Sequence, residues 1–274
     1  AFPYTGSAEI TGSLGVTGSV NFKYSSSLTS YNAWSAGGLL SQDRNFAAGA
    51  GDKTSALVFG GKFCQTVIPG VIANTEEYDG FSWSAGGYLS YARENLSGAG
   101  SQNSALAMGG EYGDQCGGPS SGNLNVLSCT EEYNGTSWST QTPLTFNRRC
   151  SAAAGNSGTS TLMFGGVHST DVPNTSPDRT NKTEEYNGSS WSVGGVLATA
   201  RMLLSGTVND GLAFGGTPTA TAKTEAYDGT AWSVNGSLIQ SRTGLTGAGT
   251  SATTAIATSG FCNSSEGSYI SNIT

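Results

Sequence analysis

The 274-residue sequence has few charged residues, a single histidine and no long apolar run. Charged residues make up only 11 %, and 12 basic against 19 acidic side chains give a formal net charge of −7. Such a chain offers no basic surface for nucleic acid or anionic lipid, so we expect neither partner. No apolar stretch reaches the roughly 18 residues of a membrane-spanning helix, and no basic start precedes an apolar segment. Neither a membrane span nor a secretion signal is therefore predicted.

Cysteine is also sparse, with five residues, an odd number, and no C-x-x-C spacing. A disulfide framework, a structural zinc site and a redox pair are therefore not expected. Two disulfide pairings remain as alternatives: Cys116 with Cys129 across one loop, and Cys64 with Cys262, which follow their glycine pairs at equivalent positions. We expect free thiols, no metal and no cofactor.

What the sequence does have is glycine, 41 residues of it, together with many serines, threonines and asparagines. These residues favour tight turns between short strands, and no window shows a sustained helical period. The composition indicates an all-β protein.

An ordered set of residues recurs along most of the chain. Each copy has one arginine, an apolar run ending in a Gly-Gly pair, a T-E-x-Y segment and a tryptophan five residues after the tyrosine. The arginines are Arg44, Arg93, Arg148, Arg201 and Arg242; the tyrosines are Tyr78, Tyr133, Tyr186 and Tyr227; the tryptophans are Trp34, Trp83, Trp138, Trp191 and Trp232. The Gly-Gly pairs end at Gly61, Gly110, Gly166 and Gly216, with a degenerate fifth copy at Gly260 and a looser fifth strand at Tyr269. The tryptophans lie 41 to 55 residues apart, which leaves no room for a separate second domain.

Each copy predicts four strands, named a to d. In the first copy, strand a covers residues 45–50, strand b residues 55–59, strand c the T-E-E-Y segment and strand d begins at Trp83. The a–b and c–d connections are short and polar, and the c–d connection carries Asp-Gly or Asn-Gly, a strong hairpin signal. The b–c loops vary widely in length, which suggests that they decorate one face.

This set of arginine, Gly-Gly pair, tyrosine and tryptophan resembles the Kelch repeat. The resemblance implies a five-bladed Kelch-like β-propeller over residues 34–274. Trp34 starts a W-S-A-G-G segment like that at Trp83, whereas the fifth copy ends without its own tryptophan. We therefore expect the N-terminal strand to complete the last blade and close the ring, which removes two exposed sheet edges.

Residues 1–22 hold a second repeat of three hexads, T-G-S-A-E-I, T-G-S-L-G-V and T-G-S-V-N-F, and residues 23–33 read as a linker. Alternating apolar positions predict a short β stem with one apolar face, which needs either copies of itself or another protein to bury it. The hexads resemble N-terminal segments of structural proteins in tailed phages, particularly marine ones. This resemblance implies an anchor that joins other virion proteins, of capsid or tail, or that self-associates. A flexible polar leader is the alternative.

The side chains that could carry chemistry have structural interpretations. We expect the tyrosines and tryptophans to plug the core between sheets. Glutamates two positions before each tyrosine, at Glu76, Glu131, Glu184 and Glu225, should pair with the repeated arginines, because a half-buried carboxylate needs a partner. Their repetition argues against a catalytic pair. The lone His168 cannot supply the two histidines of a copper oxidase that resembles galactose oxidase, and the D-G-x-x-W turns lack the spacing of a sialidase box.

We therefore expect no catalytic residues and no enzyme. Up-and-down strands place the b–c and d–a loops at the same end of every blade, and a ligand face is predicted there from Phe63, Tyr112, Asp114, His168, Asp171 and Arg179. The predicted function is a non-enzymatic virion decoration or appendage protein on the extracellular particle, which could bind host-surface glycans or a protein there. The alternatives are a Kelch-type protein–protein interaction module and a sugar-processing hydrolase.

Overall fold

The structure, a computed structural model, describes residues 36–63, 70–112, 125–168, 179–204, 211–249, 255–264 and 267–270. Every regular element in these ranges is a β-strand, so the expected all-β class is confirmed. This part of the chain contains no helix long and apolar enough to cross a membrane.

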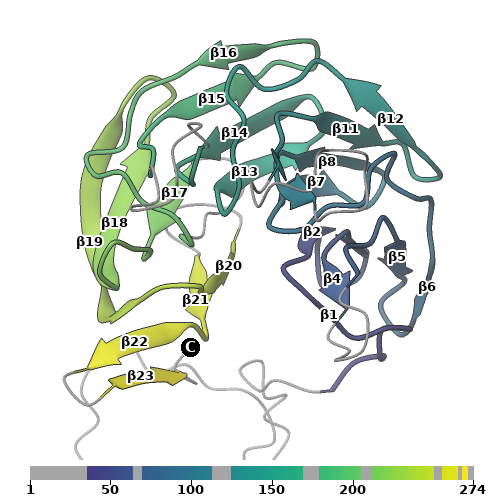
Figure 1. Ribbon diagram of the computed structural model, residues 1–274, viewed down its shortest axis with the longest axis horizontal. Helices are drawn as coiled ribbons and strands as arrows, with labels where there is room; N and C mark the ends of the chain where they lie inside the picture. The colour runs from purple at the N-terminus through teal and green to yellow at the C-terminus, as the bar shows by residue number, and fades with distance from the viewer. Residues whose placement is uncertain are drawn as a thin grey trace, which may run out of the picture. The chain divides into compact units, whose positions relative to one another are not determined.

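Most strands belong to four antiparallel sheets (Figure 1). Sheet 1 contains β2 (Ala48–Gly51), β3 (Ala56–Phe59), β5 (Thr75–Tyr78) and β6 (Trp83–Ala85). Sheet 2 contains β7 (Ser97–Ser101), β8 (Ser104–Met108), β11 (Thr130–Tyr133) and β12 (Trp138–Gln141). Sheet 3 contains β13 (Ala152–Ser157), β14 (Ser160–Phe164), β15 (Thr183–Tyr186) and β16 (Trp191–Val193). Sheet 4 contains β17 (Leu212–Phe214), β18 (Thr221–Tyr227) and β19 (Trp232–Arg242).

Four further antiparallel pairs complete the described strands. They are β1 (Arg44–Asn45) with β4 (Lys62–Phe63), β9 (Glu111–Tyr112) with β10 (Asn125–Val126), β20 (Thr246–Ala248) with β21 (Ile256–Thr258), and β22 (Phe261–Ser264) with β23 (Gly267–Ile270).

Each full sheet reproduces the predicted order a, b, c, d, and strands b, c and d begin within one residue of their expected positions. The c–d connection is a four-residue turn, because Tyr78 pairs directly with Trp83. Asp79 caps this turn: its carboxylate accepts hydrogen bonds from the backbone N–H of Phe81 and of Ser82, each at 2.8 Å. The side chains of Asn134 and Asn187 do the same in sheets 2 and 3. The Asp-Gly and Asn-Gly signals therefore predict a turn through side-chain capping of the backbone.

Sheets 1, 2 and 3 pack through their a strands, since β7 contacts both β2 and β13. The approach is close at Gly98, where a Cβ would stand 2.6 Å from the carbonyl oxygen of Gly49 and 2.7 Å from the ring of Phe59. The small a-strand residues thus let the sheets meet. Apolar side chains of adjacent sheets then form shared cores, as where Leu57 and Phe59 lie with Trp138.

The structure corrects the expected bounds of strand a. One strand is predicted over residues 45–50, but β1 and β2 are separate elements that divide at Phe46, whose φ is 54°. A left-handed residue breaks the pleat, so the segment before it pairs with β4 rather than continuing sheet 1.

The fifth copy also departs from the expected order. Strand c of this copy, β23, pairs with β22, the segment that follows Gly260, and not with strand b, which is β21. The hexads of residues 1–22, the linker 23–33 and Trp34 lie outside the described residues, so the stem and the closing strand stay predictions.

Candidate functional site

In each of the first four copies an arginine of the d–a segment forms a buried pair with a glutamate of strand c, as the sequence predicts. Three of the pairs have N–O distances of 2.9 Å (Arg93–Glu131), 2.6 Å (Arg148–Glu184) and 2.5 Å (Arg201–Glu225), and Arg44 pairs with Glu76 in the same way. In the fifth copy, the Nη1 of Arg242 donates to the carbonyl oxygen of Ser259 at 3.2 Å.

The guanidinium groups bind backbone as well as carboxylate. Nη1 of Arg93 donates to the carbonyl oxygens of Gly109 and Cys129, each at 3.0 Å, and Nη2 donates to that of Ala107 at 3.2 Å. The second oxygen of Glu131 accepts from the backbone N–H of Ser90 at 2.7 Å. Burial lowers the pKa of the Arg93 guanidinium, and the nearby carboxylate opposes that shift. The pair therefore ties the d–a segment to strands b and c, which is a structural role.

The d–a and b–c loops lie at the same end of the sheets. In every copy a residue that follows the arginine pairs with a residue that follows the glycine pair: Asn45 with Lys62, Glu94 with Glu111, Arg149 with Val167, Met202 with Thr217, and Thr243 with Phe261. We call the surface built by these two loop classes the loop face.

A chain of backbone hydrogen bonds joins one copy to the next on the loop face. The N–H groups of Asn95, Cys150, Leu203 and Gly244 each donate to the carbonyl oxygen of the equivalent residue one copy earlier, at 2.9–3.0 Å. Every member has a left-handed backbone, with φ between 52° and 60°. This conformation is costly for residues other than glycine, so the bonds must offset it. We call the set the collar; its members are Phe46, Asn95, Cys150, Leu203 and Gly244.

A polar cluster surrounds the collar between the first three copies. Glu111 accepts from Nδ2 of Asn95 at 2.6 Å and pairs with Arg149 at 3.1 Å. Glu94 pairs with Lys62 at 3.7 Å, and burial raises the pKa of the Glu94 carboxyl. The sequence analysis missed this cluster, although its residues stand one or two positions after an arginine or a glycine pair.

Four of the six predicted ligand-face residues are described, and all four lie in or beside the b–c segments. Phe63 is in β4, Tyr112 in β9, His168 follows the bridge residue Val167, and Arg179 pairs with that same residue. The other two, Asp114 and Asp171, lie outside the described residues.

Free thiols occur at Cys129 and Cys150. Burial raises the pKa of the Cys150 thiol to about 11, so it stays protonated at neutral pH. Cys64 and Cys116 lie outside the described residues. Within the described ranges, no three His, Cys, Asp or Glu side chains gather as a metal site would require.

Between sheets, tyrosines and tryptophans make polar links that the sequence analysis did not predict. Nε1 of Trp138 donates to Oγ1 of Thr75 at 2.9 Å, and its ring lies 4.8 Å from that of Phe59. The hydroxyl of Tyr133 donates to Glu77 in the preceding sheet, and Tyr227 does the same to Glu185. Burial and these carboxylates raise the pKa of both phenols. The equivalent hydroxyl of Tyr186 is buried without a hydrogen-bond partner.

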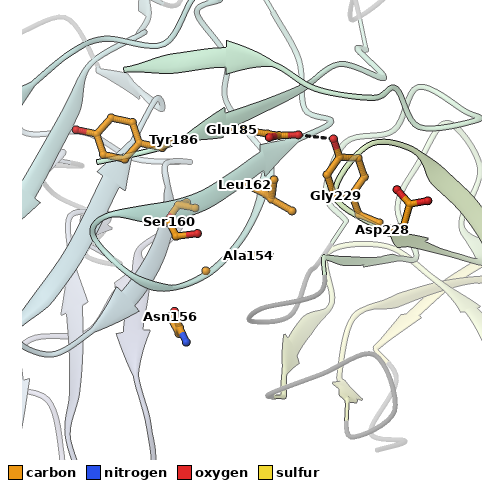
Figure 2. Close-up of a pocket in the computed structure, with 11 residues that line it drawn as sticks. Ala154, Asn156, Ser160, Leu162, Glu185, Tyr186, Asp228 and Gly229 are labelled. Atoms are coloured by element: carbon orange, nitrogen blue, oxygen red, sulfur yellow. Dashed lines mark hydrogen bonds between the residues drawn. The ribbon is translucent and has the colours of Figure 1, made fainter. Parts of the chain in front are cut away.

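Two of the cavities are lined by strands of different sheets. One, of about 590 Å³, is lined mainly by β2, β7, β13 and β20, with Leu57 of β3 and parts of the adjoining loops. The other, of about 530 Å³, lies between sheets 3 and 4, with Ser160 and Asn156 on the sheet 3 side and Asp228 on the sheet 4 side (Figure 2).

The sequence matches none of the protein-family models and none of the curated proteins with which it was compared, so the repeat and its surfaces have to be interpreted from their own geometry.

Proposed function

We propose that the chain is a five-bladed Kelch-like β-propeller, with sheets 1 to 4 as four blades and β20 to β23 in the fifth. The cavity of about 590 Å³ supports this arrangement, because the a strands of four different copies (β2, β7, β13 and β20) line it. In a propeller the first strand of every blade faces a common channel. The collar supports it too, since its bonds run in order from the first copy to the fifth.

The segment after Trp34 supports closure by the N-terminal strand. The backbone N–H of Ser41 donates to Glu76 at 2.7 Å, and Gly37 stands against the hydroxyl of Tyr78. The d–a segments of sheets 1 and 3 make the same contacts with the sheets that follow them, through Ser90 with Glu131 and Ala198 with Glu225. Residues 37–41 thus behave as the end of a d strand that belongs to the blade before sheet 1.

We infer that the propeller is a non-enzymatic recognition head, carried on a phage particle by the hexads of residues 1–22 and directed at host-surface glycans through the loop face. One observation carries this inference: backbone pairing within each copy and the collar between copies fix the bases of all the loops. A fixed base lets variable loops present polar and aromatic groups with little loss of entropy on binding. The repeated arginines and glutamates are already engaged in holding the sheets, which favours recognition over catalysis.

An array of bacterial surface polysaccharides tests the recognition role with the full-length chain. One variant replaces residues 112–126 by the short connection found at residues 217–220. Its matched control exchanges the c–d turn of sheet 3 (187–190) for that of sheet 4 (228–231), at the opposite end. We expect binding of the full chain to a restricted set of glycans, loss in the loop variant and retention in the control. Retention by a folded loop variant would show that the loop face is not the recognition surface.

The particle location is tested separately, by mass spectrometry of purified virions after deletion of residues 1–26. We expect the shortened chain to fold and to be absent from particles, because the apolar face of the hexads is the proposed attachment. Incorporation of the shortened chain would contradict the anchoring role.

A further inference from the structure

The dipeptide Asn-Gly occurs three times in the chain, in two different structural settings. Asn134 and Asn187 begin the c–d turns of sheets 2 and 3, whereas Asn235 lies within the edge strand β19. All three asparagines are exposed, so access of solvent does not distinguish them. A glycine after an asparagine matters chemically, because it has no side chain to hinder an attack of its own backbone nitrogen on the preceding carboxamide.

In the two c–d turns, residues further along the turn hold the asparagine side chain. Oδ1 of Asn187 accepts from the backbone N–H groups of Ser189 and Ser190, each at 2.9 Å. Asn134 makes the equivalent bonds in sheet 2, at 2.9–3.0 Å. The donors stand two and three residues beyond the asparagine. These bonds must therefore break before the carboxamide can turn toward the nitrogen of its own glycine.

Asn235 makes a different hydrogen bond. Its Oδ1 accepts from the backbone N–H of the next residue, Gly236, at 2.8 Å. A C=O bond is about 1.23 Å long, so the side-chain carbon Cγ lies at most about 4 Å from that nitrogen. A reactive arrangement needs roughly 3–3.5 Å. The two atoms that would have to join are therefore already close together.

A β-bulge produces this local geometry. Val234 pairs with Glu225 and Ser237 pairs with Lys223, so Asn235 and Gly236 together stand opposite one residue of β18. A bulge takes such residues out of the regular ladder, which leaves their backbone freer to move than that of a paired strand.

The repeat explains why this site differs from its counterparts. The first and third copies have Gly-Gly at the equivalent place after the tryptophan, at residues 86–87 and 194–195. There the N–H of Gly86 donates to the carbonyl oxygen of Thr75 at 2.9 Å, and a Cβ at Gly87 would stand 2.6 Å from a carbonyl oxygen of the next sheet. At Gly236 no described residue comes within 4 Å of such a Cβ. The chain thus continues along β19, with Asn235 exposed on it.

We propose that Asn235 is a site of spontaneous modification, at which the chain converts its own carboxamide into a carboxylate. The nitrogen of Gly236 loses its proton to a base in the solvent and attacks Cγ of Asn235. A bond forms between these two atoms, the Cγ–Nδ2 bond breaks, and the amide nitrogen takes up a proton and leaves as ammonia. The residue is then a cyclic imide. Water opens the imide at either of its two carbonyl carbons, which gives aspartate or isoaspartate.

The modification changes both charge and backbone. Each event adds one negative charge to the formal net charge of −7. In the isoaspartate product the main chain runs through Cβ and Cγ, so β19 gains a methylene group just before Gly236. We expect the pairing of Ser237 with Lys223 beyond it to weaken.

The test compares Asn235 with Asn187 in the same folded, full-length chain. The protein is incubated in neutral and in mildly alkaline buffer and digested with trypsin after increasing times. Cleavage gives the peptides 183–201 and 224–242, each of which contains one Asn-Gly-Ser segment and no other asparagine. Tandem mass spectrometry then follows the replacement of the amide nitrogen by oxygen and separates isoaspartate from aspartate. A sample taken before incubation corrects for conversion during digestion.

We expect Asn235 to convert roughly 10- to 30-fold faster than Asn187, because two hydrogen bonds to backbone N–H groups must first break at Asn187. The rate at Asn235 should rise with pH, since the glycine nitrogen has to lose its proton. Isoaspartate should accompany aspartate in the product, because both arise from the imide.

Two controls separate the effect of the fold from that of the sequence. Synthetic peptides 183–201 and 224–242 lack the turn and the bulge, so both should convert at similar rates. Gly236→Ala leaves the carboxamide of Asn235 in place but adds a methyl group beside the attacking nitrogen, so conversion in the folded variant should slow several-fold.

Equal rates at Asn235 and Asn187 in the folded chain would overturn the proposal. So would a rate at Asn235 that changes neither with pH nor in a folded Gly236→Ala variant, or a product without isoaspartate. Conversion of Asn235 that is as strongly slowed by folding as that of Asn187, each relative to its peptide, would also overturn it, because the fold would then protect both asparagines.

Discussion

The buried pair of Arg93 and Glu131 should contribute strongly to stability, and only as a pair. Arg93→Met preserves much of the side-chain volume but removes three bonds to backbone carbonyls and one to the carboxylate. It leaves Glu131, 1 % exposed, without its cation. Breaking a buried pair in this way costs about 3–5 kcal/mol. We expect a loss of that size in the free energy of unfolding, measured by urea denaturation.

A double-mutant cycle then isolates the pair. Glu131→Gln alone should cost about 2–3 kcal/mol, because the guanidinium stays buried without its counter-charge. The double variant should lose little more than Arg93→Met alone, which corresponds to a coupling energy of about 2 kcal/mol. Lys62→Met is the control, since Lys62 is partly exposed, pairs at 3.7 Å and should cost less than about 1 kcal/mol. Additive losses, or a loss below about 1 kcal/mol for Arg93→Met, would refute the reasoning.

Three further outcomes are expected. Tyr133→Phe should lower the free energy of unfolding by about 1–3 kcal/mol, because the Tyr133 hydroxyl donates to a carboxylate of the preceding sheet. Tyr186→Phe should be neutral or stabilising, because the Tyr186 hydroxyl is buried without a partner. Equal losses of stability in the two variants would contradict this expectation. Gly98→Ala should lower the free energy of unfolding by about 1–3 kcal/mol through overpacking, whereas Gly236→Ala should not, because open space surrounds the position of its Cβ. The urea concentrations at which half of each variant is unfolded test this difference. With the pKa of Cys150 raised to about 11, only about one thiol in a thousand is ionised at about pH 8, so peptide mapping should find its alkylation by iodoacetamide much slower in the folded chain than in urea.

The strands could be predicted from sequence because each depends on residues close together in the chain, and the arginine–glutamate pairs because their residues recur at the same place in every copy. Strand b reads as an apolar run before two glycines, and Glu131 has the same spacing to its tyrosine as its counterparts. The sequence also predicted that the b–c and d–a loops lie at the same end of the sheets, because consecutive strands alternate in direction.

The contacts between sheets could not be predicted in this way. Whether Tyr133 reaches Glu77 while Tyr186 reaches no partner depends on how two sheets approach each other, and both tyrosines have the same sequence pattern. The positions with a left-handed backbone could not be predicted either, because phenylalanine and leucine, which occupy two of them as Phe46 and Leu203, rarely adopt this conformation. Tertiary hydrogen bonding sets their backbone.

The collar has a consequence for how this protein can diversify. Its bonds join main chain to main chain, so they require of the side chain only that the residue tolerate a left-handed backbone, and a phenylalanine, an asparagine, a cysteine, a leucine and a glycine fill the five positions here. Substitution at the collar, or insertion into a loop beyond it, changes the outward surface and leaves the joints between copies intact. The same fold can thereby present different outward surfaces, since a change at these positions leaves the main-chain bonds in place.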